Sequence, residues 1–183
     1  MACEKYKLDR EIKFCDDVDM GALDAVLINA ADIKKYTASS EVGEFNVFTA
    51  IELVPSAKGY KVFDARKNPF TGSSFGHVEG EIVDKTSKTI QFVVREQGAE
   101  GAKVVQQLGG GGYVMVLRTR NNEFEIIGKN SPLYLTDKTK SITEGEGGWT
   151  VTMSTEETVV GNFLFDTDYE TTLATYEALT ETA

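Results

Sequence analysis

Alternation of apolar and polar residues is the feature that most constrains how this chain can fold. Between residues 45 and 53, one row holds Phe45, Val47, Thr49, Ile51 and Leu53, and the residues between them form a second row. A period of two places such rows on opposite faces of a β-strand. Further strands are predicted at residues 23–29, 60–63, 78–82, 89–94, 113–117, 124–127, 149–153 and 163–169.

One segment, residues 99–108, has a helical period instead. Ala102, Val105 and Leu108 fall near one stripe, and the glycines at 109–112 supply a helix stop. Residues 113–117 and 124–127 flank a polar turn and predict a hairpin. We therefore expect a mainly β domain over residues 21–183, an antiparallel β-sandwich or partial barrel with one flanking α-helix, preceded by an N-terminal arm of residues 1–20.

Charge limits the partners of this domain. The net charge of −10 argues against direct nucleic-acid binding, which needs basic surfaces to neutralise phosphates. All 19 Lys and Arg lie at or before Lys140, and residues 141–183 carry nine acidic side chains. That acidic quarter predicts either a solvated face or a surface that repels something negative. The charged first ten residues and the lack of a long apolar run predict a cytoplasmic protein without a membrane partner.

The two cysteines, Cys3 and Cys15, are expected to be free thiols. A disulfide or a metal site remains an alternative, but the only histidine, His77, is distant in sequence. Asp16, Asp17 and Asp19 faintly resemble a calcium loop but lack the distal glutamate that completes one. We therefore expect no metal and no cofactor.

No pattern in the sequence predicts an enzyme. The glycines at 109–112 follow a helix rather than precede one, so they do not form a phosphate loop. His77 follows Ser73 and Ser74, but no third partner for a catalytic triad is evident. Asp166 and Asp168 are expected to alternate on one face of a strand as solvated carboxylates.

A long, basic, glycine-containing loop is predicted at residues 64–76. Its aromatic residues Phe70 and Phe75 either contact a partner surface or fold back over the domain's own core. Arg66 and Lys67 belong to the same loop. If the loop serves a partner, deletion of residues 66–75 should leave the fold intact.

The order of segments resembles a known family. Cys15 in the arm leads through Gly21-Ala-Leu-Asp-Ala-Val-Leu-Ile-Asn29 into Asp32-Ile-Lys-Lys-Tyr36, and many strands follow. This stretch, residues 14–36, resembles small tail proteins of tailed phages and prophages of Bacteroides-type hosts, in particular tail tube subunits.

The resemblance implies a structural virion protein that self-assembles into stacked hexameric rings around a DNA conduit. It implies that the helix at 99–108 flanks the sandwich, and that the arm and the loop at 64–76 contact other subunits. The implied interface residues are Arg66, Lys67, Phe70 and Phe75. Candidates for an acidic lumen are Glu79, Glu81, Asp166 and Asp168. Other tail proteins would be partners, and DNA would pass without specific binding.

Three alternatives remain open from the sequence. The first is another β-sandwich virion component, such as a head–tail connector, a tail terminator or a capsid decoration protein. A non-viral module is also compatible with the sequence, either a ligand-binding β-barrel or a surface-recognition domain. An enzyme is the least favoured alternative.

Overall fold

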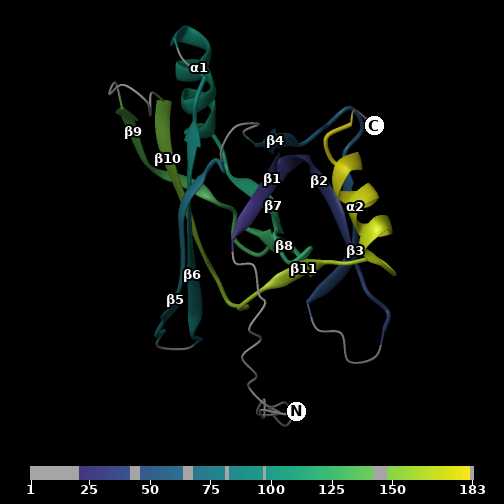
Figure 1. Cartoon of the computed structure of the whole chain (residues 1–183). Helices are drawn as coiled ribbons and strands as arrows, with labels where there is room; N and C mark the ends of the chain where they lie inside the picture. The colour runs from purple at the N-terminus through teal and green to yellow at the C-terminus, as the bar shows by residue number, and fades with distance from the viewer. Residues whose placement is uncertain are drawn as a thin grey trace.

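Two β-sheets form the body of the protein (Figure 1). The computed structural model describes residues 21–41, 46–63, 68–80, 83–96, 98–141 and 148–181. Sheet A has seven strands in the order β2-β3-β11-β8-β7-β1-β4, and sheet B has four in the order β5-β6-β10-β9. The strands of sheet A are β1 (Ala22–Asn29), β2 (Ile33–Ala38), β3 (Val47–Leu53), β4 (Tyr60–Val62), β7 (Tyr113–Thr119), β8 (Phe124–Ile127) and β11 (Asn162–Leu164). Those of sheet B are β5 (Phe70–Val78), β6 (Lys85–Val94), β9 (Tyr134–Ser141) and β10 (Gly148–Glu157).

Two inner strands of sheet A, β1 and β7, are buried on both faces. Ala25 and Leu27 of β1 pack into one apolar cluster, whereas Val26 and Ile28 of the same strand pack into a second cluster. Continuous apolar runs of this kind are expected where a sheet is covered on both sides. Sheet A is therefore the middle layer of the molecule.

The first cluster fills the space between the two sheets. Ile90 and Phe92 of β6 and Val151 and Met153 of β10 meet the inner face of sheet A there. Helix α1 (Gly98–Leu108) closes one end of this space with Val105 and Leu108. Figure 1 shows α1 above the ends of β9 and β10.

A glycine sets the position of α1. A Cβ on Gly101 would lie 1.9 Å from the carbonyl oxygen of Glu96, so the helix approaches the preceding chain where no side chain fits. Gly101 is accordingly buried, while Ala102, which the helical stripe predicted to face the core, is exposed.

The second cluster lies on the opposite face of sheet A, under helix α2 (Tyr169–Ala178). Tyr176 and Leu179 are buried against Phe124 and Leu164. The side chain of Asp168 accepts a hydrogen bond of 2.8 Å from the Thr171 amide and so caps the helix N-terminus.

A buried carboxylate joins α2 to the sheet. Asp24 of β1 is 6% exposed and accepts hydrogen bonds from the Tyr176 hydroxyl at 2.8 Å and from Nη2 of Arg118 at 2.7 Å. Lys61 of β4 adds an ion pair at 3.7 Å. One carboxylate therefore connects β1, β4, β7 and α2. Burial of Tyr176, together with its hydrogen bond to Asp24, raises the pKa of the Tyr176 hydroxyl.

The predicted fold class is confirmed: the chain is a mainly β sandwich with the flanking helix at the expected place. The 113–117 and 124–127 hairpin is also confirmed, as β7 and β8. Over the described residues the sheets do not close into a barrel, and not every pair is antiparallel, because β11 runs parallel to β3. The predicted arm, residues 1–20, lies outside the described residues.

The strand predicted at residues 163–169 is wrong beyond Leu164. Tyr169 begins α2, a second helix. The alternation of apolar and polar residues before it led to the prediction of a strand instead. The helix contains Thr171, Thr172 and Thr175, and β-branched residues favour strands when the sequence is considered by itself. Capping by Asp168 and burial of Tyr176 outweigh that preference.

Substitution Tyr176→Phe tests the link between α2 and sheet A. It removes the hydrogen bond to Asp24 without opening a cavity, so the free energy of unfolding should fall by about 1.5–3 kcal/mol, as for other hydrogen bonds to charged groups. Urea denaturation measures this loss. The exposed neighbour Glu177→Gln is the control and should be neutral; equal stability of Tyr176→Phe and wild type would contradict the assignment.

Candidate assembly surface

The outer face of sheet B carries rows of polar side chains. Strand pairing places Thr89 of β6 beside Ser154 of β10 and Ser74 of β5, and Gln91 beside Thr152. Hydrogen bonds tie the rows together: Gln91 Nε2 donates to Thr152 Oγ1 at 3.3 Å, and Thr71 Oγ1 donates to Gln91 Oε1 at 3.1 Å. The middle of this face carries small hydroxyl and amide groups and no charge.

Charges appear only at the borders of that face. Asp137 of β9 lies beside Thr152, and Glu156 of β10 lies beside Ser87. Lys85, at the far end of β6, pairs with Glu156 at 3.3 Å. The outer face of sheet B is therefore neutral at its centre with an acidic component at its rim.

Both edges of sheet B are open. β5 and β9 stand at the two ends of the strand order, so each has one side without a partner strand among the described residues. β5 spans nine residues, Phe-Thr-Gly-Ser-Ser-Phe-Gly-His-Val, of which residues 71–77 are all exposed. It contains no proline, lysine or carboxylate, which are the usual devices that protect an edge strand from pairing.

The prediction of a loop at residues 64–76 is wrong for its second half. Residues 70–78 form β5, which pairs with β6 from Phe70 opposite Phe92 to Val78 opposite Lys85. Deletion of residues 66–75 would therefore remove most of a strand and should not leave the fold intact. Arg66 and Lys67 lie outside the described residues.

The two aromatic residues of β5 differ in environment. Phe70 packs against the inter-sheet core, with its ring 6.3 Å from that of Phe92. Phe75 remains 46% exposed, and its ring lies 5.5 Å from the ammonium of Lys88. Phe70 therefore packs on the protein's own core, which is one of the two alternatives drawn from the sequence. Phe75 remains at the surface.

Beneath Phe75 lies a buried ion cluster that the sequence patterns did not predict. Lys88 is fully buried, and its Nζ lies 3.1 Å from Glu125 Oε1 and 3.2 Å from Glu157 Oε2. Glu157 also accepts a hydrogen bond from the Asn130 amide at 3.1 Å. Lys88 shares its strand face with Ile90 and Phe92. A lysine within an otherwise apolar row is the sequence feature that could have predicted this buried cluster.

Two carboxylates share one ammonium in this cluster. Desolvation by burial raises the pKa of Glu125, although Lys88 opposes the shift. A buried charge that is not fully compensated costs free energy, and protonation of Glu125 relieves that cost. The cluster therefore stabilises the protein more when Glu125 is protonated.

The acidic lumen candidates do not form one surface. Glu79 is exposed just beyond the end of β5, whereas Asp166 and Asp168 lie between β11 and α2. Figure 1 shows these two regions on opposite sides of the molecule. Backbone hydrogen bonding from Thr171 lowers the pKa of Asp168, in keeping with its role as a helix cap. Glu81 lies outside the described residues.

The described residues do not gather the side chains of a metal site, since no three His, Cys, Asp or Glu among them lie close enough together. His77, Ser73 and Ser74 all lie exposed on β5. In the same portion of the chain, neither helix has the length and apolar character needed to cross a bilayer.

Substitution Glu125→Gln tests the cluster. Because its pKa is raised in the fold, wild-type stability should decline as pH rises from the unfolded-state pKa of Glu125 towards its higher folded-state pKa. Glutamine keeps an acceptor for Lys88 but does not titrate, so the variant should lose that part of the decline. Chemical denaturation across about pH 4–7 measures this pH dependence of stability.

Substitution Lys88→Met leaves the carboxylates of Glu125 and Glu157 without their shared cation. It should lower the free energy of unfolding by about 3–5 kcal/mol at neutral pH.

No protein-family model, no curated protein and no solved structure matches this chain. The geometry of its two sheets is therefore the basis on which a function can be proposed.

Proposed function

We propose that the chain is a structural protein that self-assembles through sheet B, as a tail tube subunit does. The observation that carries this proposal is the open, uncharged edge of β5. A strand of nine residues extends for about 30 Å, and its unpaired amide and carbonyl groups form a template for another strand. Pairing with a second copy would satisfy those groups.

The opposite edge offers the partner. β9 spans Tyr134–Ser141 and is also open on one side among the described strands. Contact between β5 of one copy and β9 of the next uses two different surfaces, so it is a heterologous contact that continues from copy to copy and forms a ring if the rotation closes. The four-stranded sheets would then join into one continuous wall.

The outer face of sheet B suits the lining of a DNA conduit. Thr89, Thr152 and Ser154 present hydroxyl groups, and Asp137 at the rim adds a negative charge, whereas Glu156 is paired with Lys85. A lining whose described centre carries no cation gives phosphates nothing to bind there, so DNA can slide along it. In this arrangement the lumen candidates are the residues of sheet B, and the acidic residues at the start of α2 would lie away from the lumen.

Substitution Gly76→Lys tests the edge. A Cβ at Gly76 meets no atom within 4 Å, so the change should leave the fold intact while it places a cation on β5. Wild type should form rings or tubes at high concentration under negative-stain microscopy, and the variant should not. Thr37→Lys, on the exposed edge strand β2 of sheet A, is the matched control and should assemble normally.

The microscopy result separates the candidate functions. A wild-type protein that stays monomeric at every concentration would argue against a tube subunit. Binding to isolated capsids without self-assembly would favour a decoration protein.

The double substitution Thr89→Lys with Ser154→Lys tests the lining. Each new cation would lie on the outer face of sheet B, so assembled tubes should now retain DNA, and the retention should fall steeply as salt rises. Co-sedimentation of DNA with tubes measures this effect. Thr175→Lys on α2, which faces away from sheet B, is the control; equal DNA retention by both variants would exclude sheet B as the lining.

A further inference from the structure

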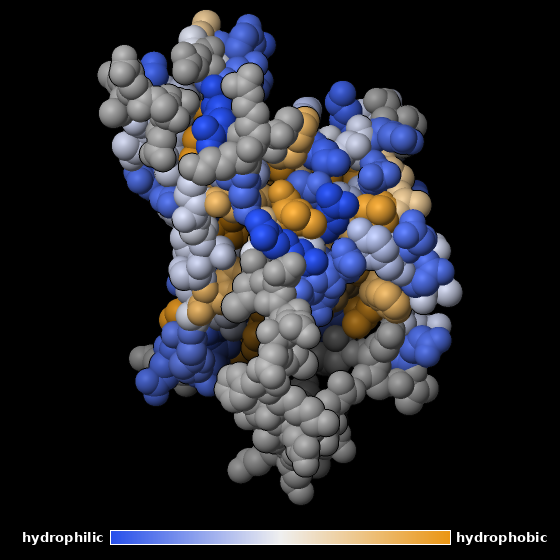
Figure 2. Space-filling view, viewed as in Figure 1, coloured by the Kyte–Doolittle hydropathy of each residue, from blue (hydrophilic) through white to orange (hydrophobic). Residues whose placement is uncertain are grey.

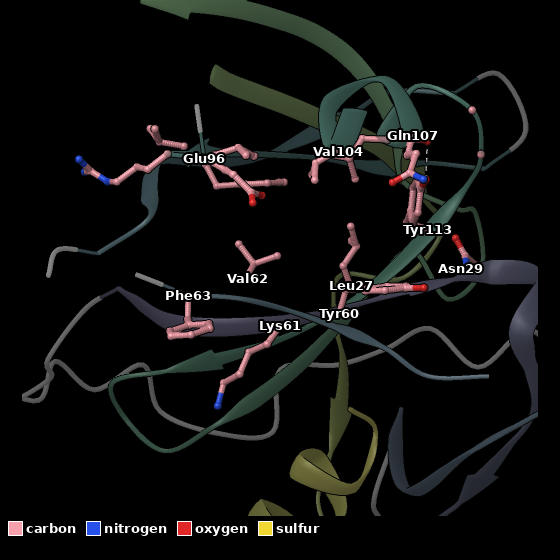
Figure 3. A pocket seen from close by; sticks show the side chains of 17 residues that line it. Leu27, Asn29, Tyr60, Lys61, Val62, Phe63, Glu96, Val104, Gln107 and Tyr113 are labelled. Atoms are coloured by element: carbon pink, nitrogen blue, oxygen red, sulfur yellow. Dashed lines mark hydrogen bonds between the residues drawn. The ribbon is translucent and has the colours of Figure 1, made fainter. Parts of the chain in front are cut away.

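A large cavity opens between the edge of sheet A and helix α1. Its volume is about 930 Å³, and its floor is formed by Leu27 of β1 with Tyr60 and Val62 of β4. Val104 of α1 lies across the opening from this floor (Figure 3), and Phe92 of β6 adds to the mainly apolar lining. Cavities of about 300–1,000 Å³ are typical of sites for small organic molecules.

Hydrogen bonds hold both walls of the cavity in place. The Tyr113 hydroxyl donates one of 2.8 Å to the Gln107 carbonyl and so fixes the C-terminal half of α1. The Gly59 amide, just before β4, donates one of 2.7 Å to the Leu179 carbonyl at the end of α2. A Cβ on Gly59 would lie 2.4 Å from Cγ1 of Val26, so glycine is needed for this close approach. The cavity is therefore part of the fold, and binding of a ligand requires no rearrangement of its walls.

The two ends of the cavity differ in chemistry. Figure 3 shows Glu96 and Phe63 at one end and Asn29, Gln107 and Tyr113 at the other. Glu96 is the only carboxylate that the described residues contribute to the lining, and its side chain is directed into the cavity. The side chain of Phe63 is 61% exposed at the same end. The three residues at the far end are uncharged.

The cations of the described lining are Lys61 and Arg95, and both are already engaged. Lys61 points away from the cavity and forms an ion pair with Asp24 at 3.7 Å. Arg95 already interacts with another part of the chain. An anionic ligand would therefore meet the carboxylate of Glu96 without a cation to offset it, whereas a cationic ligand would gain an ion pair.

We propose that this cavity binds a small amphipathic organic amine. The ammonium group contacts the Glu96 carboxylate and the ring of Phe63, and the apolar body lies between Leu27 and Val104. A charge-assisted hydrogen bond and the aromatic face both favour a cation at that end. The inference goes beyond the proposed assembly, because none of the described lining residues belongs to β5 or β9.

The geometry favours a small molecule over an added strand. An added strand gains its affinity from main-chain hydrogen bonds along an edge, and β4 offers an edge of only three residues. Figure 2 shows apolar residues at the surface over β1 and β4, bordered by polar ones. An apolar area with a polar border beside a cavity is typical of the entrance to a ligand site.

Three probes with the same eight-carbon chain test the proposal on the full chain: octylamine, octanol and octanoate. Isothermal titration calorimetry at neutral pH measures their affinities. Octylamine should bind at one site about tenfold more tightly than octanol, because it adds an ion pair to the same apolar contact, and octanoate should bind more weakly than octanol. Octylamine should also raise the thermal unfolding midpoint.

Two variants and a control assign the binding to the cavity. Glu96→Gln, at an exposed residue, should weaken octylamine binding about tenfold and leave octanol binding unchanged. Glu100→Gln removes the same charge from the exposed first turn of α1, outside the described lining, and should bind octylamine as wild type does. Val104→Trp fills the cavity and should weaken binding of octylamine and octanol at least about tenfold, while self-association is unchanged.

The other outcomes overturn the inference. Absence of binding by all three probes would exclude a ligand site. Equal affinity for the three, or tightest binding of octanoate, would exclude an amine as the ligand. Equal losses in Glu96→Gln and Glu100→Gln would show general attraction of a cation to an acidic protein. Loss of self-association in Val104→Trp would show that a second copy occupies the cavity.

Failure of this inference is distinguishable from failure of the proposed function. Tubes that form normally from a protein without probe binding would overturn only the ligand site. Octylamine binding by a protein that never assembles would overturn only the tube function.

Discussion

Burial of β1 and β7 on both faces is the constraint on which the rest of the structure depends. A strand with apolar side chains on both sides needs two covering layers. Sheet B and α1 supply one layer, and α2 supplies the other. Asp24 helps to place the second layer: Arg118 of β7 holds its carboxylate, and the hydrogen bond from Tyr176 fixes the position of α2 over that carboxylate. The inner face of sheet B packs on sheet A, and no described element covers its outer face.

The sequence patterns predict the elements that bury a regular row or stripe of apolar side chains. β1, β7 and β8 have strong apolar patterns, and α1 has a clear stripe with glycines behind it. The same patterns miss β9, because Tyr-Leu-Thr-Asp-Lys-Thr-Lys-Ser is an edge strand with little burial on either face and hence no alternation. They fail at β5 for a similar reason, since an exposed strand with two glycines resembles a loop. The open edges, which carry the proposed assembly, are therefore the elements that a hydrophobic pattern detects least well.

Two local features of the charge distribution are unusual for a β-sandwich. Lys88 and Glu157 lie fully buried between the sheets, while the exposed strand β5 carries no charged residue. Burial of an ion pair contributes little net stability, but the loss of one partner is costly, so the cluster specifies how β6, β8 and β10 meet. An uncharged edge is a liability for a monomer and an advantage for a subunit. Of the two features, only the uncharged edge bears on the proposed self-assembly.

The parallel pairing of β11 with β3 has a consequence for synthesis of the chain. β2 and β3 leave the ribosome early, yet their only link to the rest of sheet A among the described strands is β11, residues 162–164. The hairpin of β2 and β3 therefore cannot join sheet A, and Phe48 and Ile51 remain uncovered, until nearly the whole polypeptide has been translated. Contacts over such a sequence separation slow folding and prolong exposure of apolar surface. Nascent chains stalled before residue 162 should consequently depend on chaperones in a way that the released protein does not.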